Sequence, residues 1–156
     1  MNILRRLRVV RSPRLRSEQG ETLVEFALAT ILIFSAILGE VDFGRMLFAY
    51  NVVSKVARQG VRYAAVRGYT AGANAATADA VKSYVAGQSV GYVTTDNVTV
   101  KTIDAAGTNE ADWPASDNPG RLVKITATYT FNPLVLPWLP QAVRTVSSTA
   151  YMVIAR

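Results

Sequence analysis

The first half of the chain carries a helical pattern of apolar residues. Residues 26–39 form an uncharged apolar run, and beyond it apolar or small residues recur every three or four positions. We expect this stripe to cover the protein's own sheet, with contact between subunits as the alternative, and we expect Gly68 and residues 69–74 to end the helix. The stripe consists of Met46, Tyr50, Val53, Ala57, Gly60 and Ala64, and the opposite polar face of Asn51, Lys55, Arg58 and Arg62.

The second half of the chain changes from a helical period to an alternating one. A short helix is predicted over residues 75–86, with Asn74 or Thr77 as its N-cap and Gly87 in the place of a C-terminal glycine. Residues 105–120 are expected to be a loop. Strands are expected at residues 98–103, 123–131 and 146–154. The prediction is an α+β fold with a long N-terminal helix, a short second helix and a three-stranded antiparallel sheet.

The junction before the apolar run resembles the start of a prepilin. Gly20 is followed five residues later by Glu25, at the foot of the hydrophobic helix. Cleavage would then fall after Gly20 and make Glu21 the first residue of the mature protein. The helix from Leu23 to Gly39 would span about 25 Å, slightly less than the ~30 Å thickness of a hydrocarbon core. It becomes long enough if Glu25 lies within the bilayer and Val41 and Phe43 extend the far side. A carboxylate there costs about 2.5–3.5 kcal/mol, so it needs a partner, which in pilins is the new α-amino group.

Two other interpretations of this junction stay open. An ordinary secretory signal needs small residues after its apolar core, where this chain has Ile37-Leu38-Gly39. An uncleaved anchor explains the arginines and the apolar run but gives Gly20 and Glu25 no role. The prepilin interpretation accounts for all of these features, and we prefer it.

Positive charge is concentrated at the N-terminus. Residues 1–20 contain six arginines and one acid, which is +5 of the net charge of +6. The positive-inside rule therefore places this end in the cytoplasm and the chain from Glu40 onward in the periplasm. The remainder is nearly neutral, so nucleic-acid binding is not predicted. The expected divisions are a leader at 1–20, a transmembrane helix at 21–43, its extension at 44–69 and a periplasmic domain at 70–156.

Several short motifs occur together between residues 20 and 62. They are Val24-Glu25-Phe26-Ala27, Asp42-Phe43-Gly44-Arg45, Tyr50-Asn51, Ala57-Arg58, and Gly60 with Arg62. In combination they resemble the TadE-like family of the tight-adherence (Tad, Flp-type) pilus systems. The resemblance implies a pilin-like fold and a minor pseudopilin of the bacterial inner membrane, without catalytic activity.

The resemblance also implies partners and site residues. A prepilin peptidase would cut between Gly20 and Glu21, and Glu25 and Phe26 would serve assembly. The chain would support assembly or secretion of an adhesive pilus, together with a Flp-type pilin and other pseudopilins. The alternatives are a pilus structural subunit, a type II secretion pseudopilin, or a membrane-anchored periplasmic binding domain.

Candidate chemistry is sparse elsewhere. The chain has no cysteine and no histidine, which excludes a disulfide, a thiol nucleophile and the commonest general base. Asp104, Asp112 and Asp117 offer oxygen ligands for calcium, but their spacing does not match an EF-hand and such residues are ordinary turn formers. We therefore predict no metal site, no cofactor and no enzyme.

An apolar segment rich in proline precedes the last predicted strand. Residues 131–140 contain three prolines, which bar the segment from a central strand or a helix interior. Trp138 and Leu136 are therefore candidates for contact with a partner or with the membrane surface. The alternative is a loop that covers the protein's own core.

Overall fold

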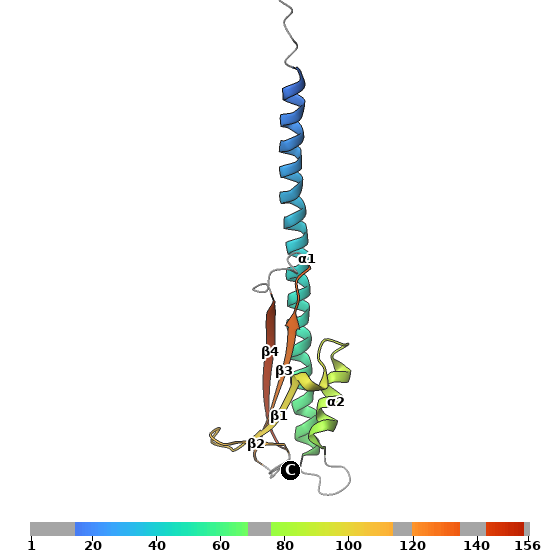
Figure 1. Ribbon diagram of the computed structural model, residues 1–156. Coiled ribbons are helices and arrows are strands. Elements are labelled where there is room, and N and C mark those ends of the chain that lie inside the picture. The colour runs from blue at the N-terminus through green and yellow to red at the C-terminus, as the bar shows by residue number, and fades with distance from the viewer. Residues whose placement is uncertain (1–14, 69–75, 114–119, 135–142, 155–156) are drawn as a thin grey trace, which may run out of the picture. The chain divides into compact units, whose positions relative to one another are not determined.

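The computed structural model describes residues 15–68, 76–113, 120–134 and 143–154, with side chains from residue 20 onward (Figure 1). Helix α1 spans Leu15–Arg67 and ends just before Gly68, as the sequence predicts. The chain divides into two compact units, Met1–Gly39 and Glu40–Arg156, and each is described by itself.

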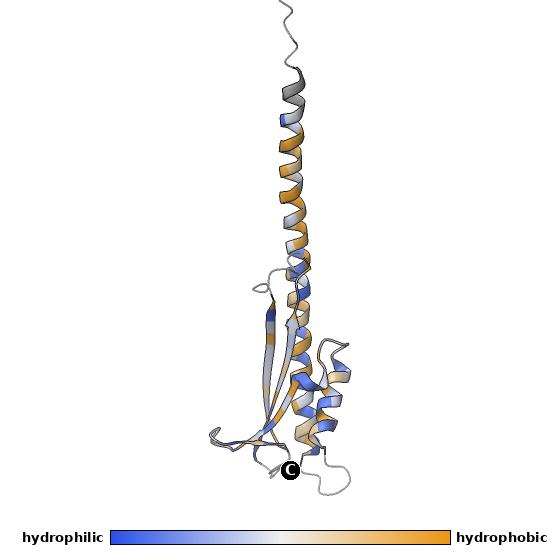
Figure 2. Ribbon diagram, in the orientation of Figure 1, coloured by the Kyte–Doolittle hydropathy of each residue, from blue (hydrophilic) through white to orange (hydrophobic). Residues whose placement is uncertain are grey.

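The part of α1 in the first unit exposes its apolar side chains around the whole helix. Figure 2 shows the apolar colouring of this stretch. Phe26, for example, is 71% exposed, and none of residues 20–39 is buried. A helix that is apolar all round is stable in water only if something covers it. By length and composition α1 is able to cross a membrane, which is consistent with a single membrane span.

The second unit is an antiparallel sheet packed on the remainder of α1. The strands are β1 (Val98–Ile103), β2 (Glu110–Asp112), β3 (Leu122–Phe131) and β4 (Arg144–Val153), in the order β2-β1-β3-β4. Strand β3 is central; it pairs with β1 over residues 122–127 and with β4 along its whole length. The α+β, pilin-like fold is thus confirmed, but the sheet has four strands instead of three. The added strand β2 lies in the predicted loop and pairs with β1 over three residues.

Alternation along β1 and β3 divides the sheet into a buried and a polar face. Val123, Ile125 and Ala127 of β3 are fully buried, while the intervening lysine and threonines are only partly covered. Val98 and Val100 of β1 continue the buried face. Burial of one face fixes the register of each strand, because a slip by one residue would expose every apolar side chain.

The helix contributes small residues to this core. Val53, Ala57, Gly60 and Ala64 are buried against the sheet and α2, which confirms that the predicted stripe covers the protein's own sheet. The expected stripe was wrong at Tyr50, which is 54% exposed, and the burial instead includes Ala49 and Val56. The buried face is therefore centred on Val53 and widens on both sides.

The second helix, α2, spans Ala78–Gln88, and a short 3₁₀ turn, Thr95–Asn97, leads into β1. The Thr77 hydroxyl accepts a hydrogen bond from the backbone N–H of Ala80, so Thr77 is the N-cap, as one of the two predicted options. The prediction for Gly87 was wrong: it lies inside the helix, and Ser89 is the C-cap. Val81 and Val85 bury the face of α2 that meets α1 and the sheet.

Candidate functional site

The predicted processing residues lie on two consecutive turns of α1. Gly20, Glu21, Glu25 and Phe26 are all exposed. A Cβ atom at Gly20 would meet no other described part of the chain within 4 Å, so no packing inside the protein requires a glycine there. Any requirement for glycine at this position would therefore come from a partner that binds this segment.

The peptide bond between Gly20 and Glu21 lies inside the helix. A peptidase that cut this bond would have to bind an extended backbone, so the helix around Gly20 would have to unwind first. Glycine weakens a helix interior by about 1 kcal/mol relative to alanine, which makes local unwinding easiest at Gly20. A new α-amino group on Glu21 would be one turn, or about 6 Å along the axis, from Glu25. That spacing permits an ion pair within one chain or with a neighbouring copy.

A buried carboxylate connects α1 to the end of β3. Asp42 is only 8% exposed. One of its oxygens accepts a hydrogen bond from Arg45 at 2.8 Å, and the other accepts the backbone N–H of Leu134 at 2.8 Å. The Arg45 guanidinium also lies over the ring of Phe131, 5.3 Å from its centroid. Because a buried charge needs a counter-charge and hydrogen bonds, Asp42 and Arg45 act together to hold the end of β3 against the helix.

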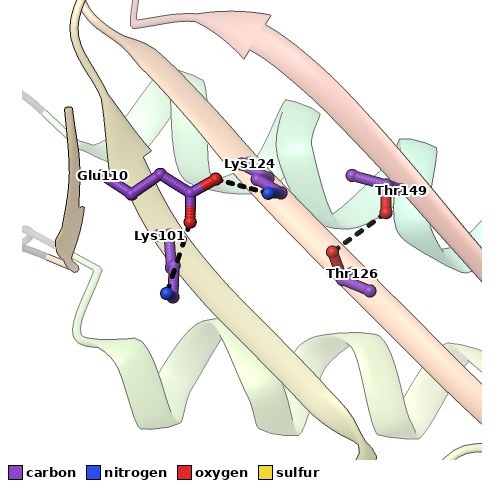
Figure 3. A network of polar contacts seen from close by, with 5 residues as sticks. All are labelled: Lys101, Glu110, Lys124, Thr126 and Thr149. Atoms are coloured by element: carbon purple, nitrogen blue, oxygen red, sulfur yellow. Dashed lines mark hydrogen bonds and ion pairs between the residues drawn. The ribbon is translucent and has the colours of Figure 1, made fainter. Parts of the chain in front are cut away.

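The polar face of the sheet carries a three-residue charge network (Figure 3). Glu110 of β2 binds Lys101 of β1 at 3.3 Å and also accepts a hydrogen bond from Lys124 of β3. The hydrogen bond from Lys124 lowers the pKa of the Glu110 carboxyl, and the same bond raises the pKa of Lys124. Beside it, Thr126 and Thr149 share a hydroxyl hydrogen bond of 3.0 Å between β3 and β4. The network joins strands across the sheet.

A hollow of about 210 Å³ lies over this network, lined by Thr99, Lys101, Glu110, Lys124 and Thr126. Its two lysines share a single carboxylate at hydrogen-bonding or ion-pair distance. With that carboxylate engaged, the hollow has no free base for proton transfer. We therefore assign the network to stabilising the short strand β2.

The weak calcium candidates do not form a site among the described residues. The Asp104 carboxylate accepts hydrogen bonds from the Thr108 backbone N–H and hydroxyl and from the Asn109 amide, at 2.7, 2.8 and 2.9 Å. The Thr108 hydroxyl and backbone N–H hold the pKa of Asp104 well below its usual range. Asp112 lies apart from this turn, opposite Lys101 in the β1–β2 register, and Asp117 is outside the described residues. Asp104 therefore shapes the turn after β1.

Two other predicted residues, Trp138 and Leu136, also lie outside the described residues. Their partner-contact role stays a prediction. Sequence reasoning did not assign roles to Asp42 or Trp113. The available signal for Asp42 was its i, i+3 spacing to Arg45, which is typical of a helical ion pair. For Trp113 no local pattern was available, because its contacts lie far away along the chain.

Comparison with known proteins bears on the N-terminal part of the chain. Residues 20–62 match the model of a family described as TadE-like protein. The match begins at Gly20, includes the apolar run and the Asp42–Arg45 step, and ends at Arg62. No curated protein and no solved structure matches the chain.

Proposed function

We propose, from the TadE-like match over residues 20–62, that this chain is a minor pseudopilin that supports assembly or secretion of a Tad (Flp-type) pilus. The match confirms the family resemblance and suggests a role in Tad pilus assembly. The family is generally non-enzymatic. The finer role rests on the observation that the matched segment contains a long helix with exposed apolar side chains on all sides. Such a surface suits a membrane in one state and neighbouring helices in another.

The proposed processing step concerns the N-terminal end of this helix. The six arginines hold the leader in the cytoplasm by the positive-inside rule, so the protein is a single-pass inner-membrane protein with a periplasmic domain. A prepilin peptidase then cuts between Gly20 and Glu21. The proposed contacts of the mature chain are a Flp-type pilin, other pseudopilins and the membrane, with Trp138 and Leu136 as further candidates.

Gly20→Val is expected to block cleavage. The peptidase must accommodate a small residue at the scissile bond, whereas the described chain itself leaves open space at Gly20. An immunoblot should show a precursor that is longer than the mature chain by the leader, residues 1–20. Gly39→Val is the matched control, because it makes the same change in the same helix and also in open space.

Two outcomes would contradict this function. Normal processing of Gly20→Val, or a native N-terminal residue other than Glu21 in the parent chain, would remove the prepilin interpretation. An uncleaved parent chain in cells that process their other prepilins would favour the membrane-anchored binding domain. Blocked cleavage in Gly39→Val as well would show a general effect of valine on this helix.

Glu25→Leu is expected to leave membrane insertion intact or improved and to reduce pilus assembly. Replacing a carboxylate within the apolar segment removes an insertion cost of about 2.5–3.5 kcal/mol. The same change removes the partner of the Glu21 α-amino group. Thr30→Leu is the control, because it adds the same side chain to the same helix without removing a charge. Wild-type numbers of pili with Glu25→Leu, counted by electron microscopy, would show that Glu25 has no docking role.

A further inference from the structure

One face of α1 in the second unit remains exposed along its whole length. Its residues follow each other at spacings of three or four, as positions on a single helix face do. All of them are exposed, and a Cβ atom at Gly44 would meet no other part of the described chain within 4 Å. We call this the outer face; it consists of Glu40, Gly44, Leu47, Asn51, Lys55, Arg58 and Arg62.

Charge on the outer face is separated by sign. Glu40 is at one end and three cations, Lys55, Arg58 and Arg62, are at the other. Elsewhere in the unit, Arg45, Lys101 and Lys124 are paired with Asp42 or Glu110. None of the three outer-face cations forms an ion pair with a described residue.

The three clustered cations destabilise the helix. Cations three and four residues apart repel each other by about 0.2–0.5 kcal/mol per pair. A face designed only for solubility would intersperse both signs, as surface helices commonly do. The arrangement instead resembles one half of a charge-complementary contact, in which the missing half is acidic.

The missing half is present at the other end of the same face. Glu40 and Arg58 are separated by five helical turns, which places them on the same line of the helix, about 27 Å apart along the axis. A second copy shifted by that distance would bring its Glu40 level with Arg58, between Lys55 and Arg62. Gly44 leaves room for the approaching helix, and Leu47 supplies an exposed apolar contact between the charged ends.

We propose that the outer face binds a second copy of this chain in an axially staggered contact, with Glu40 of one copy among Lys55, Arg58 and Arg62 of the other. The inference rests on the proposed function, because copies at equal depth in a membrane hold Glu40 beside Glu40. A stagger of about 27 Å is close to the ~30 Å thickness of a hydrocarbon core. The contact therefore forms when one copy is moved outward from the membrane relative to its neighbour.

This contact is heterologous, since the acidic end of one copy meets the basic end of the next. Each pair keeps one unused acidic end and one unused basic end. Because each step shifts the next copy along the axis, contacts of this kind do not close into a ring and do not stop at a dimer. The outer face thus has a geometry suited to stacking several copies along one axis.

Disulfide cross-linking tests the stagger, because the parent chain has no cysteine. Gly44→Cys and Arg62→Cys are also five turns apart, and together they leave Glu40, Lys55 and Arg58 in place. Within one copy the two positions are about 27 Å apart, far beyond the ~7 Å limit for a disulfide. Every bond between these two positions therefore joins two copies. In cells that assemble pili with the parent chain, oxidation should yield a ladder of dimers and larger species.

Charge swaps decide whether the ion pairs hold the contact. Arg58→Glu in the double-cysteine chain should reduce the ladder about tenfold, because like charges then face each other. Adding Glu40→Arg should restore it. The control pair is Gly44→Cys with Ser147→Cys, which places the second thiol on exposed strand β4. The stagger would be overturned by a ladder no stronger than that of the control pair, or by a ladder that Arg58→Glu leaves unchanged. It would also be overturned if the single variant Gly44→Cys gave the same cross-linked species, because copies at equal depth would produce them.

The proposed function is tested separately in the same cells, by whether the chain is cleaved after Gly20. A chain that is cleaved after Gly20 but gives no ladder overturns the staggered contact and leaves the pseudopilin role intact. A chain that is never cleaved overturns the pseudopilin role itself.

Discussion

Gly60→Val should strongly destabilise the unit Glu40–Arg156. A Cβ atom at Gly60 would lie 2.5 Å from Val85 Cγ2 and 3.0 Å from Ile125 Cδ1, closer than side chains pack. Val85 and Ile125 are both fully buried, so neither is able to move into solvent. Valine adds two methyl groups beyond that Cβ. Overpacking of this kind costs about 3 kcal/mol or more, a large part of the 5–15 kcal/mol that stabilises a typical domain.

Urea unfolding of the full chain in detergent, followed by circular dichroism, measures this effect. The matched control is Gly87→Ala in α2, where a Cβ atom meets nothing within 4 Å. Alanine there should stabilise the unit by about 0.5–1 kcal/mol, because glycine is unfavourable inside a helix. If Gly60→Val unfolds at the same urea concentration as the parent chain, α1 does not pack this closely on α2 and β3.

Gly60 also shows which part of the fold the sequence was able to predict. A small residue within an apolar stripe indicates close packing, and that inference needs only the helical period. Which residues of the stripe would be covered by the sheet was harder to predict. Tyr50 satisfies the same period as Val53 but is 54% exposed. Burial at each position depends on which distant strand or helix lies over it, and local spacing does not contain that information.

Short strands and distant contacts were the parts that sequence reasoning missed. Strand β2 has three residues, two of them acidic, so its intrinsic preference for a strand is low. It forms because β1 supplies backbone partners and because Lys101 and Lys124 bind Glu110. By contrast, the roles expected for Gly20 and Glu25 rest on local spacing alone, and they stay predictions. The hydrogen bond from the Leu134 backbone N–H to Asp42 joins residues 92 positions apart in the sequence.

Trp113 is the clearest example of such a distant contact. It follows β2 directly and is only 4% exposed. Its indole N–H donates a 2.7 Å hydrogen bond to the carbonyl oxygen of Ala76, just before α2. A Cβ atom at Gly68 would lie 2.5 Å from Trp113 Cη2, so the ring packs directly on the backbone at the end of α1. Trp113 therefore connects β2 to the ends of both helices.

Trp113→Ala is accordingly expected to destabilise the unit by about 3–5 kcal/mol, the usual cost of removing a large buried aromatic side chain. Trp113→Phe keeps an aromatic ring but loses the donor to Ala76, so it should retain part of the stability. The lost hydrogen bond alone accounts for about 1 kcal/mol, and the unpaired carbonyl adds to it. Urea unfolding followed by circular dichroism avoids the loss of tryptophan fluorescence in these variants.

The order of the three chains is the critical result for Trp113. Packing and hydrogen bonding together predict that the parent chain unfolds last, Trp113→Phe next and Trp113→Ala first. Equal stability of Trp113→Phe and the parent would assign the whole effect to packing on Gly68 and none to the Ala76 bond. Equal stability of Trp113→Ala and the parent would mean that Trp113 does not hold β2 to the helix ends, and that β2 is held by Glu110 and its two lysines.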